Sequence, residues 1–298
     1  MGNRFSIRLR NVDAVRVPAV MQTISQLERR GVPTAFGEQR FGYRLNNHIV
    51  GLLLVRDQPE ALVDEVLGSG GSWFPDHQLE RRELFDAGEY GEAARLWTRA
   101  DRTELILVKA LIREGSARAA VRAVAPSISG FWLSALQSAV FNHVLEHRIH
   151  AGGMGRLVEG DLAWVHDKRA VFPVTAEERA DPELAERLDR IEVSPSGPLW
   201  GAGMTRAAGA VGAVEHAALA DCVGDVEAYL ASKRTPDGGR RPLRAPLRHP
   251  EVDGGIDEHG HYIRVAFDLP RGVYATVAMG EVMKNDDERP RIQRSAGS

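Results

Sequence analysis

The chain has 298 residues, of which 43% are hydrophobic and 27% are charged, and its formal net charge is −3. This composition is typical of a soluble globular protein and argues against fibrous, disordered and membrane-embedded classes. The single cysteine, Cys222, cannot form an internal disulfide, and the sequence contains neither a signal-like start nor a bilayer-spanning apolar run. We therefore expect a cytoplasmic protein.

The overall charge gives no basic signal, so any binding of nucleic acid must rest on local clusters. One such cluster lies between Lys233 and His249, where Asp237 is the only acid among five arginines: Arg234, Arg240, Arg241, Arg244 and Arg248. This cluster is compatible with a patch that contacts backbone phosphates and equally with a solvated basic loop.

Alternation of apolar and polar residues predicts a strand at each end of the chain. Residues 5–10 place Phe5, Ile7 and Leu9 on one face, and residues 263–269 alternate in the same way. A helix follows the first strand, beginning near Pro18 and ending at Gly31, with apolar residues at helical spacing.

The middle of the chain reads as mostly helical. Residues 76–111 predict two or more polar-faced surface helices, and residues 131–149 predict a core-facing helix with Ser129 as a possible cap. The remaining expected elements are a hairpin at 162–174, an ordered Pro- and Gly-rich loop at 193–201, and a helix at 215–230.

The segment from Gly31 to Gly42 reads Gly-Val-Pro-Thr-Ala-Phe-Gly-Glu-Gln-Arg-Phe-Gly. Six further motifs follow a consistent order: Gly2-Asn3-Arg4-Phe5, Phe131-Trp132-Leu133-Ser134-Ala135 running into Phe141-Asn142, Gly160-Asp161, Ser194-Pro195-Ser196-Gly197-Pro198, Arg240-Arg241-Pro242, and Leu269-Pro270-Arg271-Gly272-Val273-Tyr274-Ala275-Thr276. In this order they resemble the TruD family of tRNA pseudouridine synthases. The chain departs from that pattern at Thr34-Ala35, where Asn-Tyr is usual, and at Tyr274, where Phe is common.

The resemblance implies an α/β (α+β) fold with two parts. A pseudouridine synthase catalytic domain, built on a mixed or antiparallel sheet, would be interrupted by a TruD-specific insertion domain. We expect catalytic segments at 1–30 and 239–284, the insertion at 31–238 and a flexible tail at 285–298. The strands at 5–10 and 263–269 would then pair across the insertion.

The implied reaction converts a uridine of tRNA, by family position 13 in the D arm, into pseudouridine. The base is detached from the ribose and rejoined through C5 without redox change, so the resemblance implies neither a metal nor an organic cofactor. By resemblance Asn3 would hydrogen-bond the target nucleotide, Phe5 would pack in its pocket and Tyr274 would form an aromatic wall. Arg40, Arg240, Arg241 and Arg244 are candidate RNA contacts.

The family's nucleophilic aspartate lies in a Gly-x-Lys-Asp motif, and this chain contains no Lys-Asp dipeptide. Asp13, Asp161 and Asp167 are poor substitutes because of their expected positions. We therefore expect no catalytic nucleophile within these residues, as in an amino-terminally truncated member of the family. The alternative function is that of a non-catalytic RNA-binding remnant. The expected partner is tRNA, bound by a monomer that does not associate with membranes.

Other patterns have simpler interpretations. His143 and His147 have the spacing of a helical metal pair, but no third ligand is indicated, so surface histidines are the better interpretation. Gly152, Gly153 and Gly155 lack the strand and helix that flank a phosphate-binding loop and predict a connector. For Arg40, an internal ion pair and an RNA contact both stay open.

Overall fold

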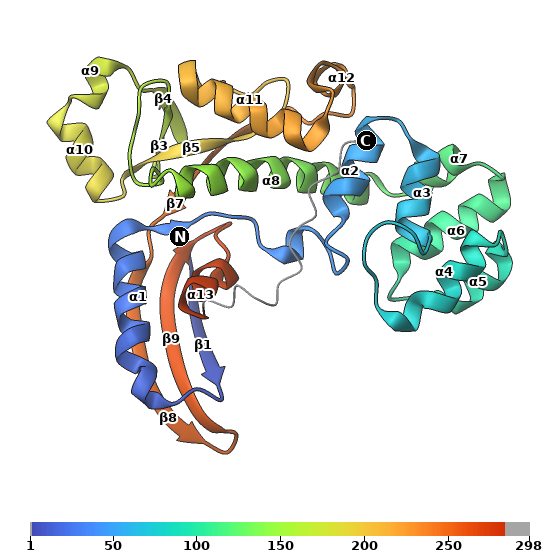
Figure 1. Ribbon diagram of the computed structural model, residues 1–298, viewed down its shortest axis with the longest axis horizontal. Helices are drawn as coiled ribbons and strands as arrows, with labels where there is room; N and C mark the ends of the chain where they lie inside the picture. The colour runs from blue at the N-terminus through green and yellow to red at the C-terminus, as the bar shows by residue number, and fades with distance from the viewer. Residues whose placement is uncertain (1, 284–298) are drawn as a thin grey trace.

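The computed structural model describes residues 2–283, so the predicted tail at 285–298 lies outside the described residues. The molecule has two lobes (Figure 1). The first, the sheet lobe, contains an antiparallel sheet of order β1-β9-β8, made of β1 (Gly2–Arg10), β9 (Gly260–Pro270) and β8 (Arg248–Asp257). The second, the insertion lobe, holds the chain between α1 (Val17–Arg30) and β8.

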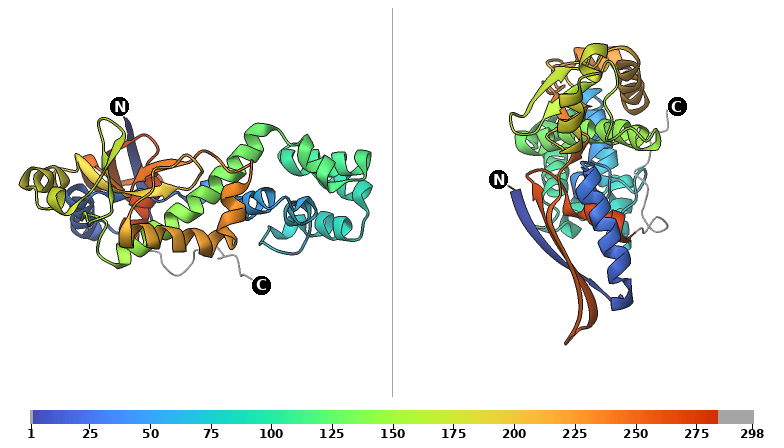
Figure 2. Two further views of the ribbon diagram at one scale, coloured as in Figure 1. Left: turned by 90° about the horizontal axis from the view of Figure 1, so that it is seen from above. Right: turned by 90° about the vertical axis from the view of Figure 1, so that its left-hand side faces the viewer.

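The sheet lobe confirms the expected pairing of the terminal strands. β1 and β9 are antiparallel, with Phe5 opposite Phe267 and Leu9 opposite Ile263. Figures 1 and 2 show α1 and α13 (Ala275–Met283) against one face of the curved sheet. On that face a common core contains Val20, Ile24 and Leu27 of α1 together with the buried apolar residues of β9: Ile263, Val265, Phe267 and Leu269.

Helix α1 begins and ends where the sequence predicts. Pro18 occupies its first turn, where a missing N–H costs nothing, and the helix ends at Gly31. Gly31 has φ +85°, and its N–H donates to the carbonyl of Leu27 at 2.8 Å. Glycine is favoured here because an L side chain rarely adopts this backbone conformation.

Two short strands mark where the chain crosses between the lobes. β2 (Val32–Pro33) enters the insertion lobe and β7 (Arg244–Ala245) leaves it, paired antiparallel with Val32 opposite Ala245. The preceding strand β6 (Gly239–Pro242) pairs with β5 (Val193–Leu199) in the sheet of the insertion lobe. The expected boundary at 238 therefore divides that sheet, and by strand pairing the crossing lies at β7.

The sheet of the insertion lobe has the order β4-β3-β5-β6. The predicted hairpin is confirmed as β3 (Leu162–Val165) and β4 (Ala170–Pro173). The predicted loop at 193–201 is wrong, because residues 193–199 form strand β5. This strand is buried along most of its length and pairs first with β3 and then with β6, so neighbouring strands supply the order that its Pro- and Gly-rich sequence lacks.

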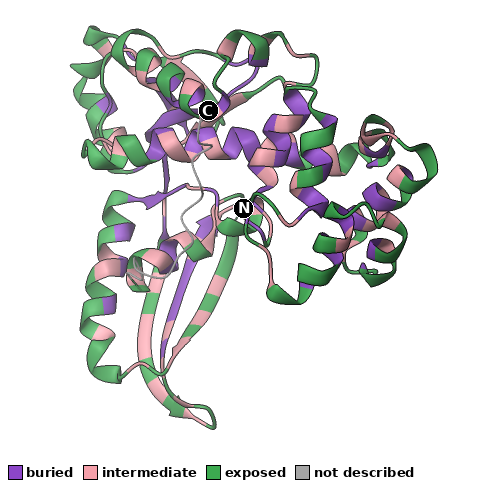
Figure 3. Ribbon diagram, turned by 45° about the vertical axis from the view of Figure 1, so that its right-hand side comes forward, coloured by how far each residue is buried: buried purple, intermediate pink, exposed green. Residues whose placement is uncertain are grey.

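Helix α8 (Pro126–His150) is the spine of the insertion lobe. Its middle part is mostly buried, whereas both of its ends carry exposed residues (Figure 3). It starts at Pro126 with Ala125 as N-cap, so Ser129 lies inside its first turn and is not the cap. Helix α2 (Asn47–Val55) packs across α8 so closely that a Cβ at Gly51 would clash with the carbonyl of Trp132. Glycine is required at this crossing.

A helical subdomain completes the insertion lobe at the far end from the sheet lobe (Figures 1 and 2). Its helices are α3 (Pro59–Leu67), η3 (Asp76–Gln78), α4 (Leu79–Asp86), α5 (Tyr90–Leu96), α6 (Arg102–Glu114) and α7 (Ala117–Ala123). The helices expected within 76–111 are present, but they enclose a core and bury Arg82 completely.

The remaining helices are η1 (Ala14–Arg16), η2 (Glu38–Arg40), α9 (Ala176–Arg179), α10 (Pro182–Asp189), α11 (Gly209–Val223) and α12 (Val226–Ala231). Of these, α11 has 15 residues and packs against α8. The single helix expected at 215–230 is broken at Gly224, which has φ +68°. Within residues 2–283 no single helix meets the length and hydropathy required to cross a membrane; one pair, α7 and α8, meets them jointly but is bent by 99°.

Candidate functional site

The signature segment lies at the junction of the two lobes. It leaves α1 at Gly31, passes through β2 and η2, and meets the segment that follows β9. A Cβ at Gly37 would lie 3.2 Å from Thr276 Oγ1 and 3.5 Å from Tyr274 Cδ1. Two motifs that are far apart in the sequence are therefore in contact at this position.

Phe36 connects the spine of the insertion lobe to Tyr274. The side chain of Asn142, on α8, accepts from the Phe36 N–H at 2.8 Å and donates to the Phe36 carbonyl at 2.9 Å. The Phe36 ring makes edge contacts with Phe141, at a centroid distance of 5.5 Å, and with Tyr274, at 6.1 Å. Tyr274 is thereby held by a segment that α8 positions.

Arg40 lies in the same cluster and has only neutral partners. Its guanidinium donates to Ser134 Oγ at 3.2 Å and to the Tyr274 hydroxyl at 3.4 Å. It also lies over the rings of Phe36 and Phe131, at 5.4 and 5.3 Å from their centroids. Among the described residues no carboxylate forms an ion pair with Arg40, and its buried Nε has no hydrogen-bond partner.

Arg241 approaches Phe36 from a different direction. Its guanidinium lies 4.3 Å from the Phe36 ring centroid and donates to the carbonyls of Thr34 and Gly272. Burial lowers the pKa of Arg241 to about 10, and the nearby charge of Arg40 acts in the same direction against an opposing effect of Tyr274. In the part of the chain that the structure describes, Arg241 also has no carboxylate partner.

We name the Arg40, Arg241, Phe36, Phe131 and Tyr274 side chains the junction cluster. It combines three aromatic rings with two arginines that have no acidic partner among residues 2–283. Such a set can stack a base and attract an anion.

The other two candidate arginines face the protein interior. Arg240 makes two hydrogen bonds of 2.7 Å to Glu215, and the two side chains are 3% and 2% exposed. Burial raises the pKa of Glu215, and Arg240 opposes that effect. Arg244 donates to the carbonyls of Arg30 and Leu188 at 3.0 and 2.6 Å. These contacts are structural, and RNA binding by Arg240 and Arg244 stays a prediction.

Asn3 and Phe5 lie near the same end of β9 as the junction cluster. Asn3 is opposite Leu269, five residues before Tyr274, and the Phe5 ring lies 6.0 Å from that of Phe267. Val273 and Ala275, on either side of Tyr274, pack on the core that Phe5 also contacts. Within residues 2–283 neither Asn3 nor Phe5 makes a hydrogen bond or ring contact with Tyr274.

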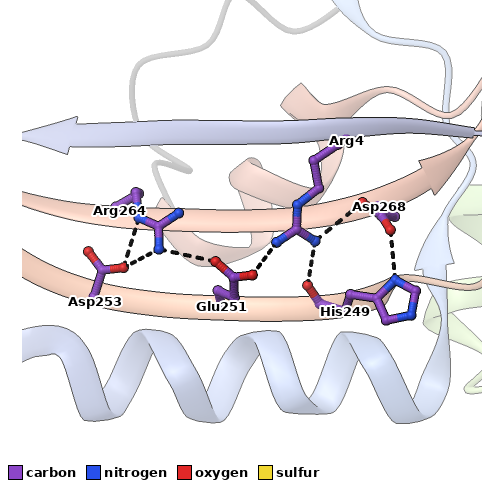
Figure 4. Close-up of polar contacts among 6 residues, drawn as sticks. All are labelled: Arg4, His249, Glu251, Asp253, Arg264 and Asp268. Carbon is purple, nitrogen blue, oxygen red and sulfur yellow. Dashed lines mark hydrogen bonds and ion pairs between the residues drawn. The ribbon is translucent and has the colours of Figure 1, made fainter.

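The opposite face of this sheet carries a ladder of ion pairs (Figure 4). Arg4 pairs with Glu251 at 2.6 Å and with Asp268 at 3.2 Å, while Arg264 pairs with Glu251 and Asp253. Hydrogen bonds from His249 and then Arg4 lower the pKa of Asp268. We call Arg4, Glu251, Asp253, Arg264 and Asp268 the sheet ladder. Because Arg4 alternates with Asn3 and Phe5, the ladder faces away from those two residues.

None of the three aspartates considered as substitute nucleophiles lies in the junction cluster. Asp13 accepts from the Val15 N–H at the start of η1. Asp161 is 1% exposed and makes hydrogen bonds of 3.0 and 2.6 Å with Arg148. Asp167 is exposed in the turn between β3 and β4.

The metal and phosphate-loop alternatives find no further support. His143 lies 3.6 Å from Asp221 and 4.0 Å from Cys222. No group of three or more His, Cys, Asp or Glu side chains suited to a metal ion exists among residues 2–283. Gly152 has φ +65° in the turn after α8, as a connector requires.

A groove of about 870 Å³ lies where α1 meets the turn after α8. Arg29 and Arg30 line it from α1 and Arg156 lines it from the insertion lobe, and all three are exposed. In the described part of the chain their guanidinium groups form neither hydrogen bonds nor ion pairs. Asp189 and Glu281 are the acids in its lining.

Comparison with known proteins identifies the family. Residues 1–282 match the family model described as tRNA pseudouridine synthase D (TruD). The chain belongs to the TruD family of tRNA pseudouridine synthases. Relatives named tRNA pseudouridine synthase D from Geobacter metallireducens and Geobacter sulfurreducens are 38% and 37% identical. Each alignment covers 95% of this chain and, respectively, 68% and 67% of the relative.

A solved structure confirms the mixed α/β fold. The putative tRNA pseudouridine synthase D (TruD) from Methanosarcina mazei superposes with a TM-score of 0.80 at 25% identity. The match covers 95% of this chain and 69% of that one. The recognition of a TruD-family pseudouridine synthase, an isomerase, from its sequence motifs is therefore confirmed.

Sequence reasoning missed the roles of three residues in this TruD-family chain. Phe36, Ser134 and Asn142 all lie in the family motifs, but motif order does not reveal which motifs touch. Asn142, which the sequence shows only as part of a motif, fixes the backbone of Phe36.

Proposed function

We propose that this chain binds tRNA and acts at the uridine at position 13 of the D arm, as part of a pseudouridine synthase. The observation that carries the proposal is the junction cluster. Segments of the family signature converge there on Tyr274. Arg40 donates to the Tyr274 hydroxyl and Arg241 lies over the Phe36 ring, and within residues 2–283 neither arginine has an acidic partner. This arrangement supports recognition of an extruded nucleotide because it offers an aromatic face and positive charge together.

Each pocket residue has a proposed task. Tyr274 stacks on the extruded uracil, while Asn3 hydrogen-bonds the target nucleotide and Phe5 excludes water from its pocket. Stacking leaves the ring free to rotate in its own plane, as it must between detachment from the ribose and attachment through C5. Phe36 fixes Tyr274 from behind, since its backbone is held by Asn142.

The nucleophile is proposed to lie outside the 298 residues. The Gly-x-Lys-Asp motif does not occur in them. Asp268 is next to Leu269, the residue opposite Asn3 in the sheet. Its side chain lies on the other face of the sheet and pairs with Arg4 and His249. A carboxylate committed to an ion-pair network is poorly suited to attack a ribose.

The groove supports binding of the RNA backbone. Three exposed arginines line it, Arg29 and Arg30 from the sheet lobe and Arg156 from the insertion lobe. Contacts of this type are sequence-independent and position the RNA, so that selection of one uridine falls to the pocket and to RNA shape.

The test combines tritium release from tRNA labelled at uridine C5 with filter binding of the same tRNA. Binding without release is expected from the 298 residues alone. Release above background would show that a carboxylate within them acts, and the proposal of an outside nucleophile would be wrong. A non-catalytic remnant would also bind without release. Adding a separate Gly-x-Lys-Asp segment distinguishes the two, because tritium release should return for part of a synthase and stay at background for a remnant.

Absence of tRNA binding would contradict the proposed function as a whole. A monomer in the cytoplasm also remains part of the proposal. Light scattering on the purified chain, with and without tRNA, measures the oligomeric state.

A further inference from the structure

We propose that Arg40 and Arg241 form a binding site for one phosphate of the RNA backbone, at a linkage that flanks the target uridine. The inference rests on the proposed function and names the chemical group that the junction cluster binds. It assigns the two arginines a positioning task, since they hold the nucleotide backbone while Tyr274 contacts the base.

Arg40 and Arg241 place two positive charges near each other. Both guanidinium groups approach the Phe36 ring, at 5.4 Å for Arg40 and 4.3 Å for Arg241. Within the described residues neither has a carboxylate partner, although buried Arg240 and Arg148 elsewhere in the lobe pair with Glu215 and Asp161. The two like charges repel each other, since the charge of Arg40 lowers the pKa of Arg241, and an anion close to both guanidinium groups relieves that repulsion.

Arg40 has hydrogen-bond donors that the protein does not fully satisfy. Its guanidinium donates to two hydroxyl groups at 3.2 and 3.4 Å, which are long distances for a charged donor, and its Nε has no partner. Arg44 and Arg82 of the helical subdomain differ, because backbone carbonyls accept from both of them at shorter distances. Arg81 also has an unpartnered Nε, but its guanidinium donates to the Leu96 carbonyl and pairs with Asp101. Arg40 differs from all three arginines because, within the described residues, neither a carbonyl nor a carboxylate accepts from its guanidinium.

Both arginines contact the segment that carries Tyr274. Arg40 donates to the hydroxyl of Tyr274, and Arg241 donates to the carbonyl of Gly272, two residues earlier. A base stacked on Tyr274 brings its own flanking phosphates into this neighbourhood. Arginine suits such a group, since its planar donors match phosphate oxygens.

The experiment uses a D-arm RNA hairpin in which one phosphate is replaced by an uncharged methylphosphonate. Three RNAs carry the replacement at the 5′ linkage of the target uridine, at its 3′ linkage, or at a linkage in the distal stem. Binding of each RNA to the wild-type chain, Arg40→Gln and Arg241→Gln is measured by filter retention. Arg95→Gln is the control, because the Arg95 side chain is 75% exposed in the helical subdomain and its partner is Glu92 on the same helix.

We expect one flanking replacement to weaken wild-type binding about tenfold or more, the usual order for a charge-assisted hydrogen bond. Arg40→Gln should bind unmodified RNA with a similar loss of affinity and weaken little more on the neutral linkage. The distal replacement and Arg95→Gln should leave affinity almost unchanged. Arg40→Lys should recover part of the affinity, since it keeps the charge but not the paired donors.

The inference is overturned if both flanking replacements leave wild-type affinity unchanged. It is also overturned if the loss of affinity from an arginine variant combined with a neutral linkage equals the product of the two separate losses, because the arginine and the phosphate would then act independently. The wild-type comparison alone decides this if an arginine variant does not fold. An anion other than phosphate, such as a carboxylate from outside these residues, would produce the unchanged affinity. Failure of the wild-type chain to bind any of the RNAs would instead contradict the proposed function, and this inference with it.

Discussion

The sheet ladder and the junction cluster use arginine in opposite ways. In the sheet ladder Arg4 and Arg264 are matched by Glu251, Asp253 and Asp268 (Figure 4). In the junction cluster Arg40 and Arg241 have hydroxyl groups, carbonyls and aromatic rings as neighbours. The contrast teaches that the number of arginines in a region says little about RNA binding, whereas their internal partners distinguish structural charges from those available to a ligand.

The largest expected effect comes from turning a matched buried arginine into an unmatched one. Glu215→Gln removes the charge that compensates Arg240, where both side chains are almost fully buried. Breaking such a pair on one side typically costs about 3–5 kcal/mol in the free energy of unfolding. Urea denaturation followed by circular dichroism measures it. A decrease below about 1 kcal/mol would show that Arg240 does not need its acid, and the comparison would fail.

The next effect concerns His166, whose imidazole stays neutral near the positive charge of Arg244. Burial, reinforced by the charges of Arg244 and Arg248, lowers the pKa of His166 from 6.5 to about 4. Between those pH values His166 is protonated in the unfolded chain and neutral in the folded chain. The free energy of unfolding therefore falls as the pH falls from about 6.5 to 4.

The contribution of His166 is at most about 3 kcal/mol, since one pKa unit corresponds to about 1.4 kcal/mol and its partial exposure reduces the effect. Thermal melting at intervals across this range, for wild type and His166→Gln, measures it. The variant should show a shallower decline in stability on acidification. Parallel curves for the two proteins would exclude His166 as a source of the acid sensitivity.

A third prediction concerns the groove, where Arg29, Arg30 and Arg156 form no ion pair with any residue from 2 to 283. Replacing Arg29, Arg30 and Arg156 together by Gln should weaken tRNA binding by about 10- to 100-fold at low salt. It should also reduce the slope of log affinity against log salt by about 0.7–0.9 for each phosphate that the protein no longer neutralises. Filter binding at several salt concentrations gives both quantities. An unchanged slope would show that RNA does not lie in this groove.

The smallest expected effect lies in the sheet ladder. Glu251→Gln removes one partner from both Arg4 and Arg264, but Glu251 is 53% exposed and water replaces it. Exposed ion pairs contribute about 0–1 kcal/mol, so urea denaturation should detect little change. The same variant should bind tRNA as wild type does. A destabilisation above about 2 kcal/mol, or weakened RNA binding, would mean that the ladder is more than a solvated pairing of charges.

Much of the sheet lobe was predictable because its signals are local. The alternation at 5–10 and 263–269, Pro18 and Gly31 all act within a few residues, and the structure follows them. Strand β5 was not predictable in the same way. It is buried in the middle of a sheet, so it lacks alternation, and its neighbours come from residues about 30 and 40 positions away.

The candidate site shows the same limit. The family motifs could be identified in the sequence, but the contacts that their side chains make could not be predicted from it. Arg240 and Arg241 are adjacent and looked equivalent, yet successive residues of a strand point to opposite faces. One therefore meets Glu215 in the interior and the other meets Phe36 at the junction.

The most direct test of the account is photo-crosslinking from tRNA that carries a single 4-thiouridine at the target position. It requires binding but no catalysis, so it applies to the 298 residues as they are. Mass spectrometry of the crosslinked peptides identifies the contact. The account predicts crosslinks to the peptide that contains Tyr274 or to the signature segment around Phe36. Crosslinks confined to the sheet ladder, in the peptides of β8 and β9 around Glu251 and Arg264, would contradict it.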